Sequence, residues 1–128
     1  MWIVNPFDPL PGDPEPPGRY ASLARVLRDA GYGVTWWTAS FSHRYKSPLD
    51  QGPLLDACRR EGIEVRFVET PRYERNVSLS RFRSHRVFAD GFSRASSAFA
   101  APAVIVASNP PMESAAAAGR VARDLGAR

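Results

Sequence analysis

The sequence VTWWTASFSHRYK, residues 34–46, passes abruptly from an apolar run to a polar one. Residues 34–38 are all β-branched or aromatic, a composition typical of a strand that is covered on both faces. The residues that follow carry hydroxyls, an imidazole, a guanidinium, a phenol and an ammonium. Because open parallel sheets bind ligands at the carboxyl ends of their strands, this stretch predicts a buried strand that leads into a binding loop.

The rest of the chain predicts strands and helices in strict alternation. Helices are expected over residues 18–30, from Pro53 to a stop at Gly62, over 78–99 and over 112–125. The other strands are expected at residues 2–5, 64–69 and 103–107, and the proline-rich segment 6–17 is expected to be a loop. This order predicts an α/β fold, a Rossmann-like three-layer arrangement with a parallel sheet of about four strands.

A doubly wound topology would make the first and fourth strands neighbours, so that residues 5–18 face residues 108–111 across a crevice. The third strand alternates apolar and charged residues, which indicates a position near the edge of the sheet. The fourth strand is almost wholly apolar yet would be left at the other edge. We therefore expect either a domain truncated before its next strand or a partner chain that covers this edge.

Length and composition indicate one soluble domain, residues 1–128. The chain has 128 residues, 44% hydrophobic and 23% charged, and no apolar run approaches the roughly 18 residues of a membrane span. A start without a basic leader and a single cysteine, Cys58, favour a cytoplasmic location. The net charge of +4 favours anionic partners, either phosphates, nucleic acid or an anionic membrane face.

The sequence lacks the motifs of several common cofactor sites and active sites. The first loop has only Gly12 and Gly18 among prolines, and no acid ends the second strand, which argues against a nicotinamide or flavin cofactor. The Gly-Lys-Ser phosphate loop and the nucleophile elbow of hydrolases are also absent. His43 and His85 lie far apart without Cys/His spacing around them, so the sequence predicts no metal site.

Three loops carry a more specific pattern. GRY at residues 18–20 opens the first helix, and TASFSHRYK at 38–46 follows the second strand; ETPRYERNVS at 69–78 and ASNPP at 107–111 follow the third and fourth. In this order the stretches resemble the N-terminal domain of family 4 GT-B glycosyltransferases, most closely the bacterial enzymes of surface-polysaccharide assembly. The resemblance extends over essentially the whole chain.

This resemblance implies a retaining enzyme that transfers a sugar from a nucleotide-sugar donor to a saccharide or lipid-linked acceptor. In that family the N-terminal domain mainly holds the acceptor, and a C-terminal domain holds the nucleotide sugar. The resemblance therefore implies no resident cofactor, and it implies that this chain alone is inactive. Catalytic residues are not assigned. The resemblance implies that acceptor binding falls to nine residues: Gly18, Ser40, Ser42, His43, Arg72, Tyr73, Asn76, Ser108 and Asn109.

Each of these assignments has a simpler structural alternative. Ser40, Ser42 and His43 would either bind acceptor hydroxyls or merely close a turn, and Asn109 would line the crevice or cap the following helix. The basic residues from Arg72 to Arg86 suit an acceptor diphosphate or the anionic leaflet at the inner face of a membrane. We favour function for Arg72 and a solvated helix face for Arg81 and Arg83. Core packing is favoured over lipid contact for the helical phenylalanines, Phe82, Phe88, Phe92 and Phe99.

The sequence is also compatible with two other functions. A stand-alone module would bind an anion or a partner protein through the arginines, although the pattern of aromatic residues typical of nucleic-acid binding is lacking, so no nucleic acid is expected. A split glycosyltransferase would combine this chain with a second one that supplies the donor domain.

Overall fold

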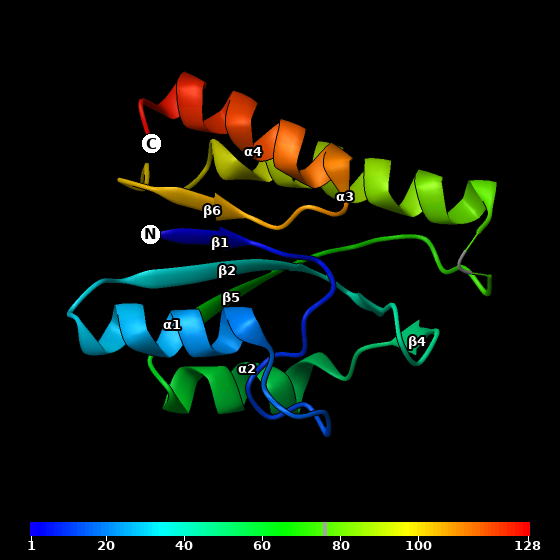
Figure 1. Ribbon diagram of the computed structural model, residues 1–128, viewed down its shortest axis with the longest axis horizontal. Coiled ribbons are helices and arrows are strands. Elements are labelled where there is room, and N and C mark those ends of the chain that lie inside the picture. Colours follow the sequence, from blue (N-terminus) through cyan, green and yellow to red (C-terminus); the bar gives the residue numbers. More distant parts are fainter. Residues whose placement is uncertain (76) are drawn as a thin grey trace.

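The computed structural model describes residues 1–75 and 77–128. Its main sheet has four parallel strands in the order β5-β2-β1-β6, with helices on both faces (Figure 1). This confirms the predicted α/β, Rossmann-like fold. The strands are β1 (Trp2–Val4), β2 (Val34–Ala39), β5 (Ile63–Val68) and β6 (Ile105–Ala107). The helices are α1 (Arg19–Asp29), α2 (Gln51–Arg60), α3 (Leu79–Ser96) and α4 (Met112–Leu125).

The strand register confirms the predicted neighbours. β1 lies between β2 and β6, and Val4 pairs with Trp37 on one side and with Ala107 on the other. β5 pairs only with β2 and forms one edge of the sheet, as its alternating sequence predicted. All four carboxyl ends therefore lie along one side of the molecule, at the right of Figure 1. The loop after β1 lies beside the loop after β6 at this side.

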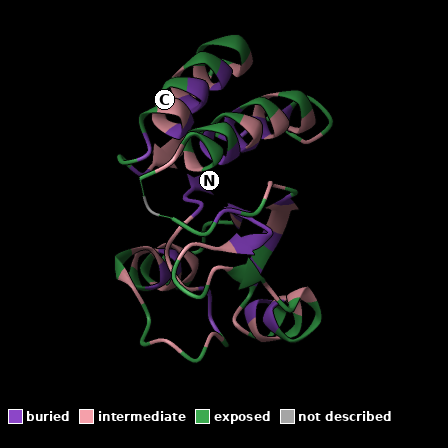
Figure 2. Cartoon of the chain, turned by 90° about the vertical axis from the view of Figure 1, so that its right-hand side faces the viewer, coloured by how far each residue is buried: buried purple, intermediate pink, exposed green. Residues whose placement is uncertain are grey.

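Each face of the sheet has its own core. On one face α3 and α4 cover Trp2 and Trp37, whose rings meet edge-on at 5.4 Å, and Phe92 packs against both. On the other face α1 and α2 cover Trp36 and smaller apolar residues. The buried sides of the helices face the sheet in Figure 2. Trp36 and Trp37 are thus core residues, as predicted.

Helix α2 ends where Gly62 was expected to stop it. Gly62 after α2 adopts a φ of 68°, in the left-handed region that glycine enters without a steric penalty. Gly91 lies inside a continuous α3. An added Cβ there would lie 2.5 Å from Val68 Cγ1. Glycine at this position therefore lets α3 approach β5 closely.

Two local differences from the sequence predictions lie in loops. Residues 41–48 form a small antiparallel hairpin, β3 (Phe41–Ser42) with β4 (Ser47–Pro48), which was not predicted because two-residue strands leave no periodic pattern. The predicted capping role of Asn109 is wrong. Since α4 begins at Met112, its N-cap residue is Pro111 and Asn109 lies two residues earlier.

The proline-rich segment is a loop, as predicted, and it is anchored at two points. Leu10 is buried in the core under α1 and α2, and the Pro11 carbonyl accepts a contact from Cys58 Sγ at 3.7 Å. At the β6 edge of the sheet, Arg128 lies beside β6 and the residues just before it. The Arg128 N–H donates to the Ala103 carbonyl, and the Arg128 carbonyl accepts from the Ile105 N–H.

Candidate functional site

Aromatic rings from three elements meet at the carboxyl side of the sheet. Phe7, in the loop after β1, lies between His43 of the β3–β4 turn and His85 of α3, with ring centroids 4.9 and 5.3 Å away. Tyr73, in the loop after β5, is buried and packs against Phe41. The fold thus brings together residues that lie up to 78 positions apart, because strand ends and helix starts share this side.

His43 has a defined hydrogen-bonding pattern. Its Nδ1 lies 2.5 Å from the Tyr73 hydroxyl and 3.4 Å from Lys46 Nζ. Because an ammonium group only donates, Nδ1 acts as the acceptor and Nε2 carries the proton. Lys46 also donates to the His43 carbonyl and lies 4.7 Å from the centre of the Tyr73 ring. The imidazole is therefore positioned to offer an N–H to a ligand.

Arg81 and His85 extend this group from α3. They are one helical turn apart, and Arg81 Nε donates to His85 Nε2 at 3.3 Å. The other ring nitrogen of His85 lies 3.8 Å from Glu113 Oε2 at the start of α4. We call His43, Lys46, Arg81 and His85 the cationic cluster.

The electrostatics of the cationic cluster disfavour further positive charge. Burial, and then the charges of Lys46, Arg81 and His85, lower the pKa of His43 to about 4. Burial and Arg81 lower the pKa of His85, against an opposing effect of Glu113. Burial and Arg81 also lower the pKa of Lys46. At neutral pH the cluster therefore combines neutral imidazoles with two cations whose mutual repulsion a bound anion would relieve.

His43 also borders a small crevice with an acidic lining. The crevice has a volume of about 60 Å³ and is lined by Asp8, Asp13 and Glu15 together with Ser42 and His43. Ser42 Oγ accepts from the Tyr45 N–H at 3.1 Å, and Glu15 pairs with Arg44 at 2.9 Å. Carboxylates and a hydroxyl at this place suit a ligand that donates hydrogen bonds, such as a sugar hydroxyl.

The start of α1 differs from the usual phosphate site of such folds. The Asp8 carboxylate lies against this helix start, 3.5 Å from the Tyr20 N–H, where it complements the positive end of the helix dipole. A Cβ at Gly18 would lie 2.8 Å from Asp8 Oδ2. Gly18 therefore makes room for a carboxylate of the protein itself, at the position where an external phosphate would otherwise bind.

Two other predicted residues lie away from the cationic cluster. Ser40 is buried, and its hydroxyl donates to Glu69 at 2.8 Å while accepting from the Thr70 N–H at 3.3 Å. Its role here is to tie the end of β2 to the end of β5. Arg72 is exposed and lines a separate hollow with Ser40 and Glu69.

The loop after β6 places two further candidates beside the loop after β1. Ser108 is buried, and its Oγ has no hydrogen-bond partner among the described residues. Asn5, directly after β1, is also buried, and its Nδ2 lacks a partner among them as well. Asn109 is exposed, and Asn76 lies outside the described residues. Because Val4 pairs with Ala107, Asn5 and Ser108 follow neighbouring strand ends at the predicted crevice.

Exposed apolar side chains surround the start of α3. Val77, Leu79 and Phe82 are 89%, 88% and 58% exposed, and Met112 at the start of α4 is 73% exposed. Phe82 lies 6.3 Å from His85, which joins this surface to the cationic cluster. Arg83 and Arg86 are exposed on the same helix. We call Val77, Leu79 and Phe82 the apolar patch. The core position predicted for Phe82 is wrong, whereas Phe88 and Phe92 are buried and Phe99 packs against the core.

Sequence reasoning missed several members of the site. Phe7 and Asp8 stand in a proline-rich segment whose conformation no periodicity reveals. Arg81 was assigned to a solvated face, although its spacing of four residues from His85 places both side chains on one side of a helix. This four-residue spacing could have identified Arg81 as a neighbour of His85 from the sequence.

Comparisons with known protein families, curated proteins and solved structures give no match. Across residues 1–75 and 77–128, no helix is long and apolar enough to cross a membrane. The same residues contain no group of three or more His, Cys, Asp or Glu side chains arranged to hold a metal ion.

Proposed function

We propose that this chain is the acceptor-side part of the N-terminal domain of a family 4-like GT-B glycosyltransferase. The proposed acceptor is a saccharide linked to a lipid diphosphate. The observation that carries the proposal is the position of His43, which belongs to the cationic cluster and also lines the acidic crevice.

The cationic cluster supplies the contacts that a diphosphate needs. Lys46 and Arg81 provide charge, and a guanidinium can bind two phosphate oxygens at once. Because Nδ1 of His43 accepts a hydrogen bond, its Nε2–H is a further donor. A bound anion would also offset the effect of Arg81 on the pKa of Lys46.

The acidic crevice supports binding of the first sugar. Asp8 and Asp13 accept hydrogen bonds from hydroxyl groups, and the Phe7 ring offers an apolar surface next to them. The sugar would then lie on one side of His43 while the diphosphate lies on the other. This division explains why acidic and basic side chains occur so close together.

The apolar patch supports the lipid part of the acceptor. Exposed apolar residues beside exposed arginines suit the surface of an anionic membrane, into which Leu79 and Phe82 would insert. The patch adjoins the cationic cluster through Phe82 and His85. A diphosphate at the membrane surface would thus reach the cluster while its lipid tail stays in the bilayer.

Transfer itself requires a donor site that we assign elsewhere. Asp8 at the start of α1 disfavours a donor phosphate there. We therefore assign the nucleotide sugar to a C-terminal domain or a partner chain, and we expect this chain alone to be inactive.

Vesicle binding tests the proposal. Vesicles of neutral and anionic lipids, with and without a polyprenyl-diphosphate sugar, are sedimented with the chain. We expect the diphosphate lipid to increase binding, and Arg81→Ala to remove that increase. The double variant Leu79→Ser/Phe82→Ser should abolish vesicle binding, whereas Val26→Ser, which changes an exposed apolar residue of α1, should not.

Two results would overturn the proposal. Equal binding to vesicles with and without the diphosphate lipid would show that the chain does not recognise the proposed acceptor. Binding of inorganic pyrophosphate with no preference for the lipid-linked sugar would favour a stand-alone anion-binding module.

A further inference from the structure

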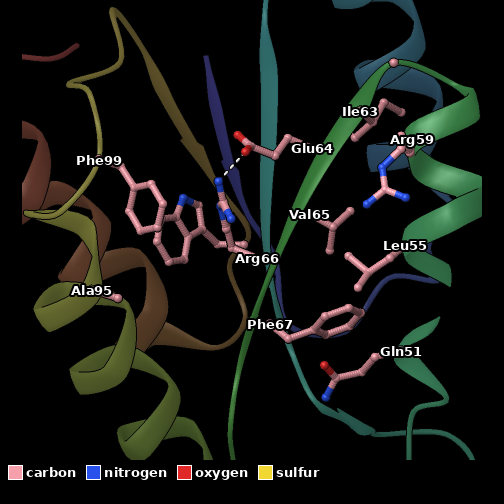
Figure 3. Close-up of a pocket in the computed structure, with 12 residues that line it drawn as sticks. Gln51, Leu55, Arg59, Ile63, Glu64, Val65, Arg66, Phe67, Ala95 and Phe99 are labelled. Atoms are coloured by element: carbon pink, nitrogen blue, oxygen red, sulfur yellow. Dashed lines mark hydrogen bonds and ion pairs between the residues drawn. The ribbon is translucent and has the colours of Figure 1, made fainter.

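The outer edge of β5 faces an open groove. The groove has a volume of about 730 Å³ and lies between α2, which contributes Leu55 and Arg59, and the end of α3, which contributes Ala95. Figure 3 shows β5 running between these helices, with its free edge toward the viewer. This groove lies along the side of the sheet, away from the cationic cluster.

The backbone groups of β5 that point into the groove can be assigned. The Val68 carbonyl accepts from the Ser40 N–H at 3.0 Å, so the groups of Val68 point toward β2. In a parallel strand the N–H and C=O of one residue point to the same side, and the side alternates along the strand. The N–H and C=O groups of Ile63, Val65 and Phe67 therefore point outward.

The side chains of β5 also alternate. Ile63 and Val65 belong to the core under α1 and α2, and Phe67 packs against it. Glu64 and Arg66 lie on the opposite face, where they form an ion pair. The free edge thus presents one apolar face and one charged face.

We propose that this edge pairs with the same edge of a second copy of the chain. The two β5 strands would run antiparallel about a two-fold axis at Val65. Ile63 of one copy then lies opposite Phe67 of the other, and the outward backbone groups of three residues in each strand meet as hydrogen-bonded pairs. The two sheets would join into one of eight strands.

Charge selects this register. With the axis at Val65, Glu64 of each copy lies opposite Arg66 of the other. An axis at Glu64 or at Arg66 would set like charges directly opposite each other, which is destabilising. Charged side chains often protect edge strands from pairing, but the alternating signs here are complementary to themselves.

Both charged side chains are held near these positions. Glu64 accepts from Thr35 Oγ1 at 2.9 Å, and the Arg66 guanidinium lies 4.5 Å from the centre of the Phe99 ring. Arg66 Nε is buried and has no acceptor among the described residues. Because the paired strands run antiparallel, the two carboxyl sides point in opposite directions, and both acceptor sites stay open. The inference is therefore independent of the proposed function.

Sedimentation of charge-reversed variants tests this pairing. We expect the unmodified chain to dimerise with rising concentration, and Glu64→Arg or Arg66→Glu alone to weaken dimerisation about tenfold or more. An equimolar mixture of the two single variants should form a heterodimer, because each strand then faces opposite charges. The double variant Glu64→Arg/Arg66→Glu should dimerise like the unmodified chain.

The mixture separates pairing from folding damage, since a chain that fails to fold gains nothing from a second damaged chain. A monomer at the highest soluble concentration would overturn the inference. So would single variants that dimerise normally, or a mixture that stays monomeric. Should a single variant fail to fold, the double variant, which keeps an ion pair within the strand, decides the question: a monomeric double variant overturns the register.

Discussion

The start of α1 and the start of α3 lie at the same side of the sheet but carry opposite charges. A carboxylate at α1 disfavours a bound anion, whereas basic side chains at α3 favour one. At α1 the protein places its own carboxylate, Asp8, against the helix start. At α3 it gathers Arg81 and His85 beside Lys46 and His43. The first position is the usual phosphate site of doubly wound sheets, and here it is filled. Fold alone would therefore predict an anion at the start of α1, whereas the side chains favour one at the start of α3.

The largest expected effect is the loss of pyrophosphate binding when the cationic cluster is changed. Arg81→Ala should weaken pyrophosphate binding by about 10-fold to 100-fold, since a charge-assisted hydrogen bond contributes about 1.5–3 kcal/mol. Calorimetric titration measures this loss. Arg94→Ala, an exposed arginine in the last turn of the same helix, is the matched control and should bind as the unmodified chain does. Equal losses in both variants would indicate that net charge, and not the cluster, attracts the anion.

A smaller effect is expected when the Asp8 carboxylate is removed from the start of α1. Asp8→Asn removes the negative charge at the start of α1 and should lower the free energy of unfolding by about 0.3–1 kcal/mol. Added sulfate should stabilise this variant more than the unmodified chain, because an anion can then replace the carboxylate. Thermal unfolding with and without sulfate measures both effects. An identical response to sulfate would show that Asp8 does not exclude anions from α1.

The smallest effect concerns protonation of His43. Its pKa of about 4 lies below the ordinary value of 6.5, so the free protein holds it neutral down to acidic pH. A bound anion favours the protonated form and should raise this pKa. By linkage, pyrophosphate affinity should then increase as the pH falls from 6.5 toward 4. NMR titration of the His43 ring with and without pyrophosphate measures the shift, and an unchanged pKa would place the anion away from His43.

The fold was predictable because its signals are periodic and repeated. The apolar run at Val34, the alternation in β5 and the helix-ending glycines each follow from the local sequence, and together they require a parallel sheet. The burial of Trp36 and Trp37 follows from the same pattern. The neighbouring positions of β1 and β6 followed from the doubly wound topology.

The site was predictable only in part. The family resemblance implied acceptor binding for His43 and Tyr73, and the structure brings these two side chains into contact. Arg72 also follows a strand, yet it is exposed and lines a separate hollow with Ser40 and Glu69. Phe7 and Asp8 depend on the path of a proline-rich loop, which is fixed by tertiary contacts such as the burial of Leu10. Sequence spacing does not encode such contacts.

The most direct test of the account is to map bound pyrophosphate by NMR on the labelled chain. We expect an anion to bind at the start of α3 and not at the start of α1. Amide shifts should change at His43, Lys46, Arg81 and His85, and they should stay unchanged at Gly18, Arg19 and Tyr20. Changes confined to Gly18, Arg19 and Tyr20 would contradict the account.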